Sequence, residues 1–310
     1  MVEAVVRLIA ETVGMASLAI DEPMSKHTTF KIGGPADLIV EPGTTNQLIA
    51  LLRLFKRFNI PYFVMGNGSN LLVGDKGIRG AVVKISSQMS ACDVSGATVT
   101  AESGIKLARL AQAALNNGLA GLEFASGIPG TLGGAVYMNA GAYGGEMKDI
   151  VKEVICVDTK NESLTRMPAA ACNFGYRKSI FTNGEFIITG AVLELSEGNT
   201  DEIRAKMNEL AARRNEKQPV DKPSAGSTFK RPEGYFAGTM IDECGLKGTR
   251  VGGAEVSMKH AGFVVNIDNA TAADVIGVID KVKAEVKNRF GVELEPEVKF
   301  VGEFYLQMMH

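Results

Sequence analysis

The stretch GLEFASGIPGTLGGAVYMNAGAYGG, residues 121–145, decides how the rest of the chain is organised. It contains eight glycines in 25 residues, whereas the whole chain contains 35 in 310. Glycine loses more backbone entropy on folding than any other residue, so this density indicates that backbone must closely approach something. Tight turns here would expose N–H groups suited to a diphosphate. The residues of these turns are Gly127, Ile128, Pro129, Gly130, Thr131, Gly133, Gly134 and Ala135. The alternative is a series of packed turns.

A second glycine loop follows a predicted strand, PYFVMG, about 60 residues earlier. It consists of Gly66, Asn67, Gly68, Ser69, Asn70 and Leu71. The third glycine of a Rossmann fingerprint is missing and no helical pattern follows, and no G-K-[ST] of a phosphate-binding P-loop is present. Asparagine and serine also favour ordinary turns, so a hairpin turn is the alternative interpretation.

Composition restricts the class of protein. The length predicts two or three domains, and 45% hydrophobic with 22% charged residues is ordinary for a globular protein. A net charge of −2 gives no electrostatic reason to expect nucleic-acid binding. No apolar run approaches the roughly 18 residues of a membrane span, and residues 1–14 read as an amphipathic helix, not a signal peptide. We therefore expect a cytoplasmic protein with neither nucleic acid nor membrane as partner.

Cysteine and histidine are too sparse for a metal site. The four cysteines are scattered without a C-x-x-C pair, which argues against both zinc and a disulfide framework. The three histidines are His27, His260 and His310. We expect no metal, and we interpret the cysteines and His260 as structural.

The remaining patterns predict an α+β protein. Thr44 is expected to cap a helix that runs to residue 58, with Gln47 as its capping-box partner, and Ser103 to cap a helix that ends at Gly118. Further helices are predicted over 201–216 and 271–290. Short strands dominate the middle of the chain, and one strand is predicted near the C-terminus, in VELEPEVKFVG.

Five motifs occur in an order that resembles a known family. They are GNGSN at 66–70, SGIPGTLGGAVYMNAGAYG at 126–144, Tyr176-Arg177 with Ser179, GSTFK at 226–230 and EPEV at 295–298. Any one is weak, but together they are specific, and the resemblance runs from about residue 29 to residue 302. The chain resembles the UDP-N-acetylenolpyruvoylglucosamine reductase family, also called UDP-N-acetylmuramate dehydrogenases. The short segment around NFGYRKSIF resembles the family's shorter type, without an added tyrosine-bearing loop.

The resemblance implies a fold and a reaction. Non-covalent FAD would lie in a flavin domain of the vanillyl-alcohol-oxidase (PCMH) type, built from two α+β subdomains at 1–88 (completed by 296–310) and 89–216. A C-terminal α+β substrate-binding lobe would span 217–295. NADPH would reduce the flavin, which then reduces the enolpyruvyl group of a UDP-sugar in peptidoglycan precursor synthesis. We expect a monomer, although the sequence itself does not define the oligomeric state.

The family motifs select three catalytic candidates: Arg177, Ser227 and Glu297. Hydride addition to an enol ether conjugated to a carboxylate builds negative charge on that carboxylate, which the permanent charge of Arg177 can stabilise in a bidentate fork. Ser227 is the candidate general acid for the adjacent carbon. Glu297 either donates a hydrogen bond to the developing charge or, if ionised, orients Arg177. Taken singly, each is more often a turn or surface residue.

Four further residues receive roles from the resemblance. Asn139 and Tyr143 are expected on the flavin side, and Tyr176 and Lys230 on the substrate side, where Lys230 would meet a phosphate. Two other functions remain open. One is a flavin oxidase or dehydrogenase of the same fold, for which no histidine motif supplies a base; the other is a UDP-sugar-binding regulator that lacks catalysis.

Overall fold

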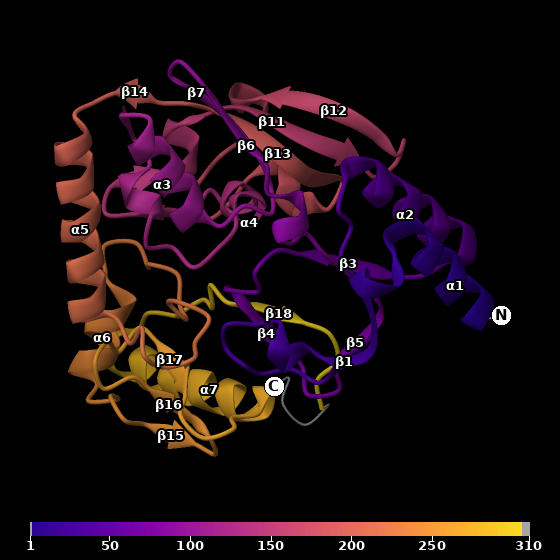
Figure 1. Ribbon diagram of the computed structural model, residues 1–310. Helices are drawn as coiled ribbons and strands as arrows, with labels where there is room; N and C mark the ends of the chain where they lie inside the picture. The colour runs from indigo at the N-terminus through magenta and orange to yellow at the C-terminus, as the bar shows by residue number, and fades with distance from the viewer. Residues whose placement is uncertain (1, 306–310) are drawn as a thin grey trace. The chain divides into compact units, whose positions relative to one another are not determined.

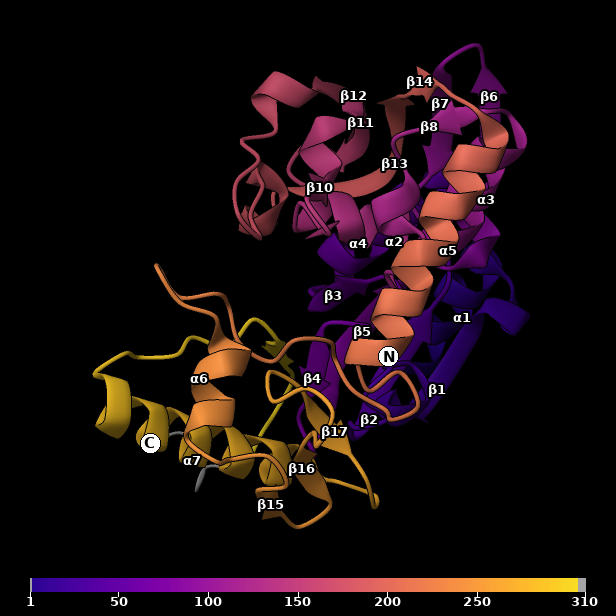
Figure 2. The same ribbon diagram turned by 90° about the vertical axis from the view of Figure 1, so that its left-hand side faces the viewer.

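The computed structural model describes residues 2–305 and divides the chain into two compact units (Figures 1 and 2). Unit 1 holds the chain up to Ala19, Ile39–Asn67 and Ala81–Arg213, and unit 2 holds Ile20–Leu38, Gly68–Gly80 and the chain from Arg214 onward. The division into three domains predicted above is not tested by these two units and stays a prediction. Residues 306–310 of its first domain, including His310, lie outside the described residues.

Seven α-helices occur in the described chain: α1 (Val2–Val13), α2 (Thr45–Phe58), α3 (Leu107–Asn116), α4 (Leu132–Tyr137), α5 (Thr200–Lys217), α6 (Ala237–Glu243) and α7 (Ala272–Phe290). The helices predicted over residues 1–14, 44–58, 201–216 and 271–290 are therefore confirmed.

The longer strands of the described chain are β1 (Leu18–Pro23), β2 (Pro35–Val40), β3 (Tyr62–Met65), β5 (Ile78–Lys84), β6 (Cys92–Ser95), β7 (Thr98–Glu102), β11 (Val151–Asp158), β12 (Ser163–Pro168) and β13 (Phe186–Glu194). The shorter ones are β4 (Leu71–Val73), β8 (Leu119–Ala120), β9 (Gly141–Ala142), β10 (Gly145–Glu146), β14 (Ser196–Glu197), β15 (Arg250–Val251), β16 (Ala254–Val256), β17 (Val264–Asn266) and β18 (Lys299–Val301).

Unit 1 is organised around an antiparallel five-stranded sheet with the order β12-β11-β13-β7-β6. Helix α4 packs against β13 and β7, and α3 against β6 and β8, on the side of the sheet seen beneath β11 and β13 in Figure 1. Alternate residues of the strands, such as Val99, Ala101, Ala191 and Leu193, are buried in one core with these helices. This period of two is what a sheet with one covered face requires.

Unit 2 has a core of its own. Helix α7 buries an apolar stripe that includes Val275, Ile279 and Val286, and it packs along the small antiparallel sheet β15-β16-β17 (Figure 2). Thr271 caps α7 in a reciprocal capping box with Asp274. In the same unit, β18 pairs with β4 in parallel, Lys299 opposite Leu71. A four-stranded sheet, β1-β2-β5-β3, completes the main β-structure of the described chain.

Two helix starts show how far local patterns predict structure. Thr44 caps α2, since its hydroxyl accepts from the N–H of Gln47 at 3.1 Å, but the Gln47 side chain accepts from Gly43, one residue before the cap. The prediction that Ser103 caps α3 is wrong: α3 begins at Leu107 and its N-cap is Lys106. Ser103 instead lies in the turn that directly follows β7, where its N–H donates to the carbonyl of Thr189 at 2.9 Å.

The C-terminal strand is shorter than predicted. Strand β18 begins at Lys299, so Glu297 does not lie on it, contrary to the prediction. Pro296, which has no N–H to give to a ladder, forms only an isolated bridge to Phe229. Within residues 2–305, every helix is too short or too polar to cross a lipid bilayer.

Candidate active site

The two glycine loops meet in unit 1. The side-chain amide of Asn67 donates to the carbonyl of Pro129 at 2.7 Å. A Cβ added to Gly66 would lie 2.4 Å from Oγ1 of Thr131, far inside van der Waals contact. At Gly66, therefore, the backbone of one loop lies against the Thr131 side chain of the other, and a Cβ fits only if that side chain shifts. Since β3 pairs with β5 and β4 pairs with β18, the loop joins two sheets and is not a hairpin turn.

The hydrogen bonding of the first loop suits an anion. Its carbonyls are engaged: that of Gly68 accepts from the N–H of Thr29 at 3.3 Å, and that of Asn70 from the N–H of Lys299 at 2.9 Å. Within the described part of the chain, the N–H groups of residues 66–70 donate to no backbone carbonyl of their own unit. Successive backbone N–H groups of a turn can form the nests that bind phosphate.

The second loop uses part of its backbone for contacts within the protein. The N–H of Gly133 donates to the carbonyl of Ser103 at 2.8 Å, so it is not available to a ligand. A Cβ on Gly133 would lie 2.8 Å from Cβ of Ser103, so the close approach at this position is to protein. Gly134 is different, because the nearest atom to an added Cβ, Oγ1 of Thr131, is 3.8 Å away. Ala135 is buried at 3% exposure and Ile128 packs against the core of unit 1.

Arg177 lies in a tight turn of unit 1. Gly175 and Lys178 exchange backbone hydrogen bonds of 2.9 and 3.2 Å, which leaves Tyr176 and Arg177 between them. Arg177 has a φ of 53°, and its Nη2 donates to the carbonyl of Gly141 at 3.3 Å. Its guanidinium carbon lies 5.1 Å from the centre of the Tyr176 ring, whose residue is about half exposed. The turn thus presents a cation stacked on an aromatic ring.

Tyr143 occupies the tip of the β9–β10 hairpin. Its φ of 53° is in the left-handed region, where an aromatic residue is unusual. The residue is 41% exposed, and the guanidinium of Arg213 on α5 lies 5.0 Å from the centre of its ring. This contact was not predicted from the sequence. Asn139, in contrast, is fully buried.

In unit 2, the segment that contains Ser227 is hydrogen-bonded to two other segments, one at Gly262 and Val264 and one at Glu297. Thr228 donates its N–H to the carbonyl of Gly262 at 2.8 Å, and its hydroxyl accepts from the N–H of Val264 at 2.9 Å. Its carbonyl accepts from the N–H of Glu297 at 2.8 Å. Gly226, with a φ of 81°, makes the turn that precedes Ser227. The structure therefore brings the Ser227 and Glu297 segments together. Thr228, which makes the hydrogen bonds between the segments, was not predicted, because no feature of a turn motif indicates that its threonine is buried.

Glu297 and Lys230 lie on the same pair of segments. The Asn70 amide donates to the carbonyl of Glu297 at 3.2 Å, which ties the end of the first glycine loop to this candidate. Glu297 is half-buried. Lys230 instead pairs through Nζ with Oε2 of Glu295 at 2.7 Å, and its ammonium lowers the pKa of that exposed carboxyl. The two glutamates therefore have different environments, although they are two residues apart.

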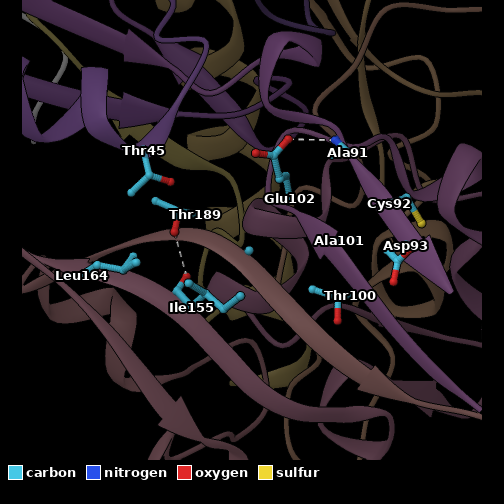
Figure 3. Close-up of a pocket in the computed structure, with 11 residues that line it drawn as sticks. Thr45, Ala91, Cys92, Asp93, Thr100, Ala101, Glu102, Ile155, Leu164 and Thr189 are labelled. Atoms are coloured by element: carbon cyan, nitrogen blue, oxygen red, sulfur yellow. Dashed lines mark hydrogen bonds between the residues drawn. The ribbon is translucent and has the colours of Figure 1, made fainter. Parts of the chain in front are cut away.

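A cavity of about 320 Å³ lies elsewhere in unit 1 (Figure 3). Thr189 faces it from β13 and donates to the carbonyl of Ile155 at 3.3 Å, while Glu102 accepts from the N–H of Ala91 at 2.8 Å. The full lining is Thr45, Ala91, Cys92, Asp93, Thr100, Ala101, Glu102, Ile155, Leu164, Thr189 and Gly190. None of the predicted site residues lines it, so it is separate from the candidate site.

Two family models match the chain. Residues 36–167 match an FAD-binding domain. Residues 218–301 match the C-terminal domain of UDP-N-acetylenolpyruvoylglucosamine reductase. The backbone N–H groups of the first loop, none of which donates to a backbone carbonyl of its own unit within the described residues, fit a dinucleotide diphosphate. With the α+β fold, these findings define an FAD-dependent oxidoreductase whose flavin domain is of the vanillyl-alcohol-oxidase (PCMH) type.

Relatives cover nearly the whole chain. A UDP-N-acetylenolpyruvoylglucosamine reductase from Caldanaerobacter subterraneus subsp. tengcongensis is 51% identical over 98% of this chain and 100% of its own length. One from Clostridioides difficile is 51% identical over 92% of this chain and 94% of its own. The crystal structure of the enzyme (MurB) from Thermus caldophilus superposes with a TM-score of 0.78 at 36% identity, covering 91% of this chain and 97% of that one. The chain belongs to the UDP-N-acetylenolpyruvoylglucosamine reductase family, flavoproteins of peptidoglycan synthesis.

Proposed function

We propose that this enzyme uses NADPH to reduce the enolpyruvyl group of UDP-N-acetylglucosamine enolpyruvate to UDP-N-acetylmuramate. When bound, FAD would supply the hydride-transfer chemistry that links NADPH to the terminal alkene carbon. The observation that carries the proposal is a backbone hydrogen bond in a chain of this family. The N–H of Glu297 donates to the carbonyl of Thr228, the residue after Ser227, and so joins the two segments. That pairing supports roles for a hydroxyl and a carboxyl group in one reaction.

Arg177 binds the carboxylate of the substrate in this proposal. Negative charge grows on that carboxylate as the alkene is reduced, and a guanidinium stays charged at any physiological pH. A preorganised donor of this type is worth about 3–4 kcal/mol at a site from which water is excluded. The turn between Gly175 and Lys178 fixes the backbone of Arg177, so part of the ordering cost is met before substrate binds.

Ser227 donates the proton that the adjacent carbon needs. A hydroxyl is a weak acid, and it can act only if it is held within hydrogen-bond reach of the basic carbon. The three hydrogen bonds of Thr228 restrain the backbone next to Ser227, which supports such a role. Glu297 hydrogen-bonds the substrate as its charge develops, and Lys230 contacts a substrate phosphate.

Separate measurement of the two half-reactions tests these roles. The flavin of Ser227→Ala should bleach with NADPH at the wild-type rate under anaerobic conditions, and should then fail to regain its absorbance when the enolpyruvyl UDP-sugar is added. Glu297→Gln, which keeps a hydrogen-bond donor, should reoxidise faster than Glu297→Ala. Wild-type reoxidation of Ser227→Ala would remove the serine from its role as proton donor.

A further inference from the structure

The turn that carries Arg177 is pinned to the rest of unit 1 at both ends. On one side, the Ser179 hydroxyl donates to the carbonyl of Tyr137 at 2.6 Å, and Ser179 is only 1% exposed. On the other, Nδ2 of Asn139 donates to the carbonyl of Gly175 at 3.0 Å. The two anchors, Tyr137 and Asn139, lie two residues apart at the end of α4, so the turn is fixed to a single short segment.

Asn139 uses both ends of its side-chain amide to make this connection. Its second Nδ2 hydrogen is donated to Oε2 of Glu146 at 2.8 Å, and its Oδ1 accepts from the N–H of Lys148 at 2.9 Å. The residue has 0% exposure and a φ of 45°, in the left-handed region that asparagine tolerates. Because both amide hydrogens are already donated within the protein, we do not expect the flavin contact that the sequence predicted.

Glu146 brings a negative charge to the same place. It forms an ion pair with Lys148 at 3.0 Å, and its carboxylate also caps the turn that follows, in a capping box with Asp149. The hydrogen bond from Lys148 is the main reason that the pKa of Glu146 lies below its ordinary value, and the Asn139 amide and the charge of Arg177 act in the same direction against a cost of burial. Arg177 therefore lies within the field of this carboxylate.

The β9–β10 hairpin closes the network. Glu146 is the last residue of β10, and it pairs in register with Gly141, the residue whose carbonyl accepts from Arg177. Asn139 thus holds two parts that adjoin Arg177: the Gly175 end of the turn and the hairpin strand opposite Gly141. Loss of the amide would free both at once and deprive two acceptors of their shared donor.

We propose that Asn139 is a positioning residue for Arg177, acting through the carbonyl of Gly175 and the carboxylate of Glu146, and that it takes no part in flavin binding. This inference rests on the proposed role of Arg177 in binding the substrate carboxylate. A displacement of about 1 Å at a reacting group can cost on the order of 10²-fold in rate. The loss of Asn139 is therefore expected to affect only the step in which substrate reoxidises the flavin.

The test compares Asn139→Ala with Asn173→Ala in single-turnover experiments. Asn173 is exposed, lies in the same segment as the Arg177 turn and has a similar left-handed φ of 47°, so its substitution carries the same backbone strain without the buried hydrogen bonds. Each protein is reduced anaerobically with NADPH and mixed with the enolpyruvyl UDP-sugar. Asn139→Ala should keep its flavin and its reduction rate but reoxidise on the order of 10²-fold more slowly, and Asn173→Ala should match the wild type.

A double variant separates positioning from general damage. If Asn139 acts through Arg177, Asn139→Ala combined with Arg177→Ala should reoxidise no more slowly than Arg177→Ala alone. Multiplied losses, loss of flavin, or slowed reduction would overturn the inference. Should Asn139→Ala not accumulate as folded flavoprotein, Asn139→Gly makes the same deletion without backbone strain.

The two proposals fail in different ways. Normal reoxidation by Arg177→Ala would refute the proposed role of Arg177, and the inference with it. Slow reoxidation by Arg177→Ala together with normal reoxidation by Asn139→Ala would refute the inference alone.

Discussion

Gly66→Ala changes a single atom at the point where the two glycine loops meet. The new Cβ would lie 2.4 Å from Oγ1 of Thr131, whereas ordinary contact begins at 3.4 Å, so the atoms must separate by 3.4 − 2.4 = 1.0 Å. Thr131 is 5% exposed, so its side chain has little room to move. Overpacking of this kind costs about 1–3 kcal/mol.

The cost should appear in FAD affinity. The apoprotein can relieve the contact by letting the loops separate, and FAD binding must then restore them. The dissociation constant of FAD should therefore rise about 5- to 150-fold, the equivalent of 1–3 kcal/mol. Titration of apoprotein with FAD, followed by flavin fluorescence, measures this constant, and the circular dichroism of the apoprotein should be unchanged.

The structure also predicts the rescue. Without Oγ1 of Thr131, the nearest remaining atom to the Cβ added at position 66 is Cβ of residue 131 at 3.6 Å, an ordinary contact. Gly66→Ala combined with Thr131→Ala should thus bind FAD almost as well as Thr131→Ala alone. If the double variant binds as weakly as Gly66→Ala, the steric explanation is wrong, and Gly66 is required for another reason.

Three further outcomes are expected. Gly134→Ala adds a Cβ no closer than 3.8 Å to Thr131, so the apoprotein should melt no lower than the wild type while FAD affinity falls if the diphosphate approaches this backbone; unchanged affinity would place the diphosphate elsewhere. Burial lowers the pKa of His260 below its ordinary value of 6.5, and its Nδ1 accepts from a backbone N–H. The unfolded chain therefore takes up the proton first as pH falls through that value, and His260→Gln should lose less melting temperature than the wild type between about pH 7.5 and 5; equal losses would show that the imidazole is not responsible. Glu295→Gln removes the carboxylate that competes for Lys230, so KM for the UDP-sugar should fall by up to about fivefold with unchanged kcat, and a rise in KM would mean that Glu295 orients the lysine.

The sequence predicted the helices well where local signals are strong. Helix α2 has its cap at Thr44, a buried stripe, and Asn59 in the left-handed region at its end, all of which depend on nearby residues. Ser103 carries the same local signal as Thr44, but tertiary contacts override it. The hydrogen bond to Thr189 and the approach of Gly133 hold its backbone in the turn that follows β7, so the helix starts three residues later than a cap at Ser103 would place it.

The candidate site was predictable as a set of motifs and not as a set of contacts. Glycine density indicated close backbone approach, and the structure distinguishes two causes: Gly66 is crowded by the other loop, and Gly133 by Ser103. Asn139 could not be separated from the flavin-side residues by sequence, because its partners, Gly175 and Glu146, lie 36 and seven residues away. Sequence spacing does not report which acceptor a buried amide meets.

The most direct measurement is an anaerobic flavin titration in D₂O. NADPH should bleach the flavin absorbance of the purified protein, and one equivalent of the enolpyruvyl UDP-sugar should restore it. Because the hydroxyl of Ser227 exchanges with solvent, mass spectrometry should find solvent deuterium on the carbon next to the carboxylate of the reduced sugar, in addition to any label that the reduced flavin takes from solvent before it transfers hydrogen. A protein without flavin, or a reduced flavin that oxygen reoxidises and the UDP-sugar does not, would contradict the account.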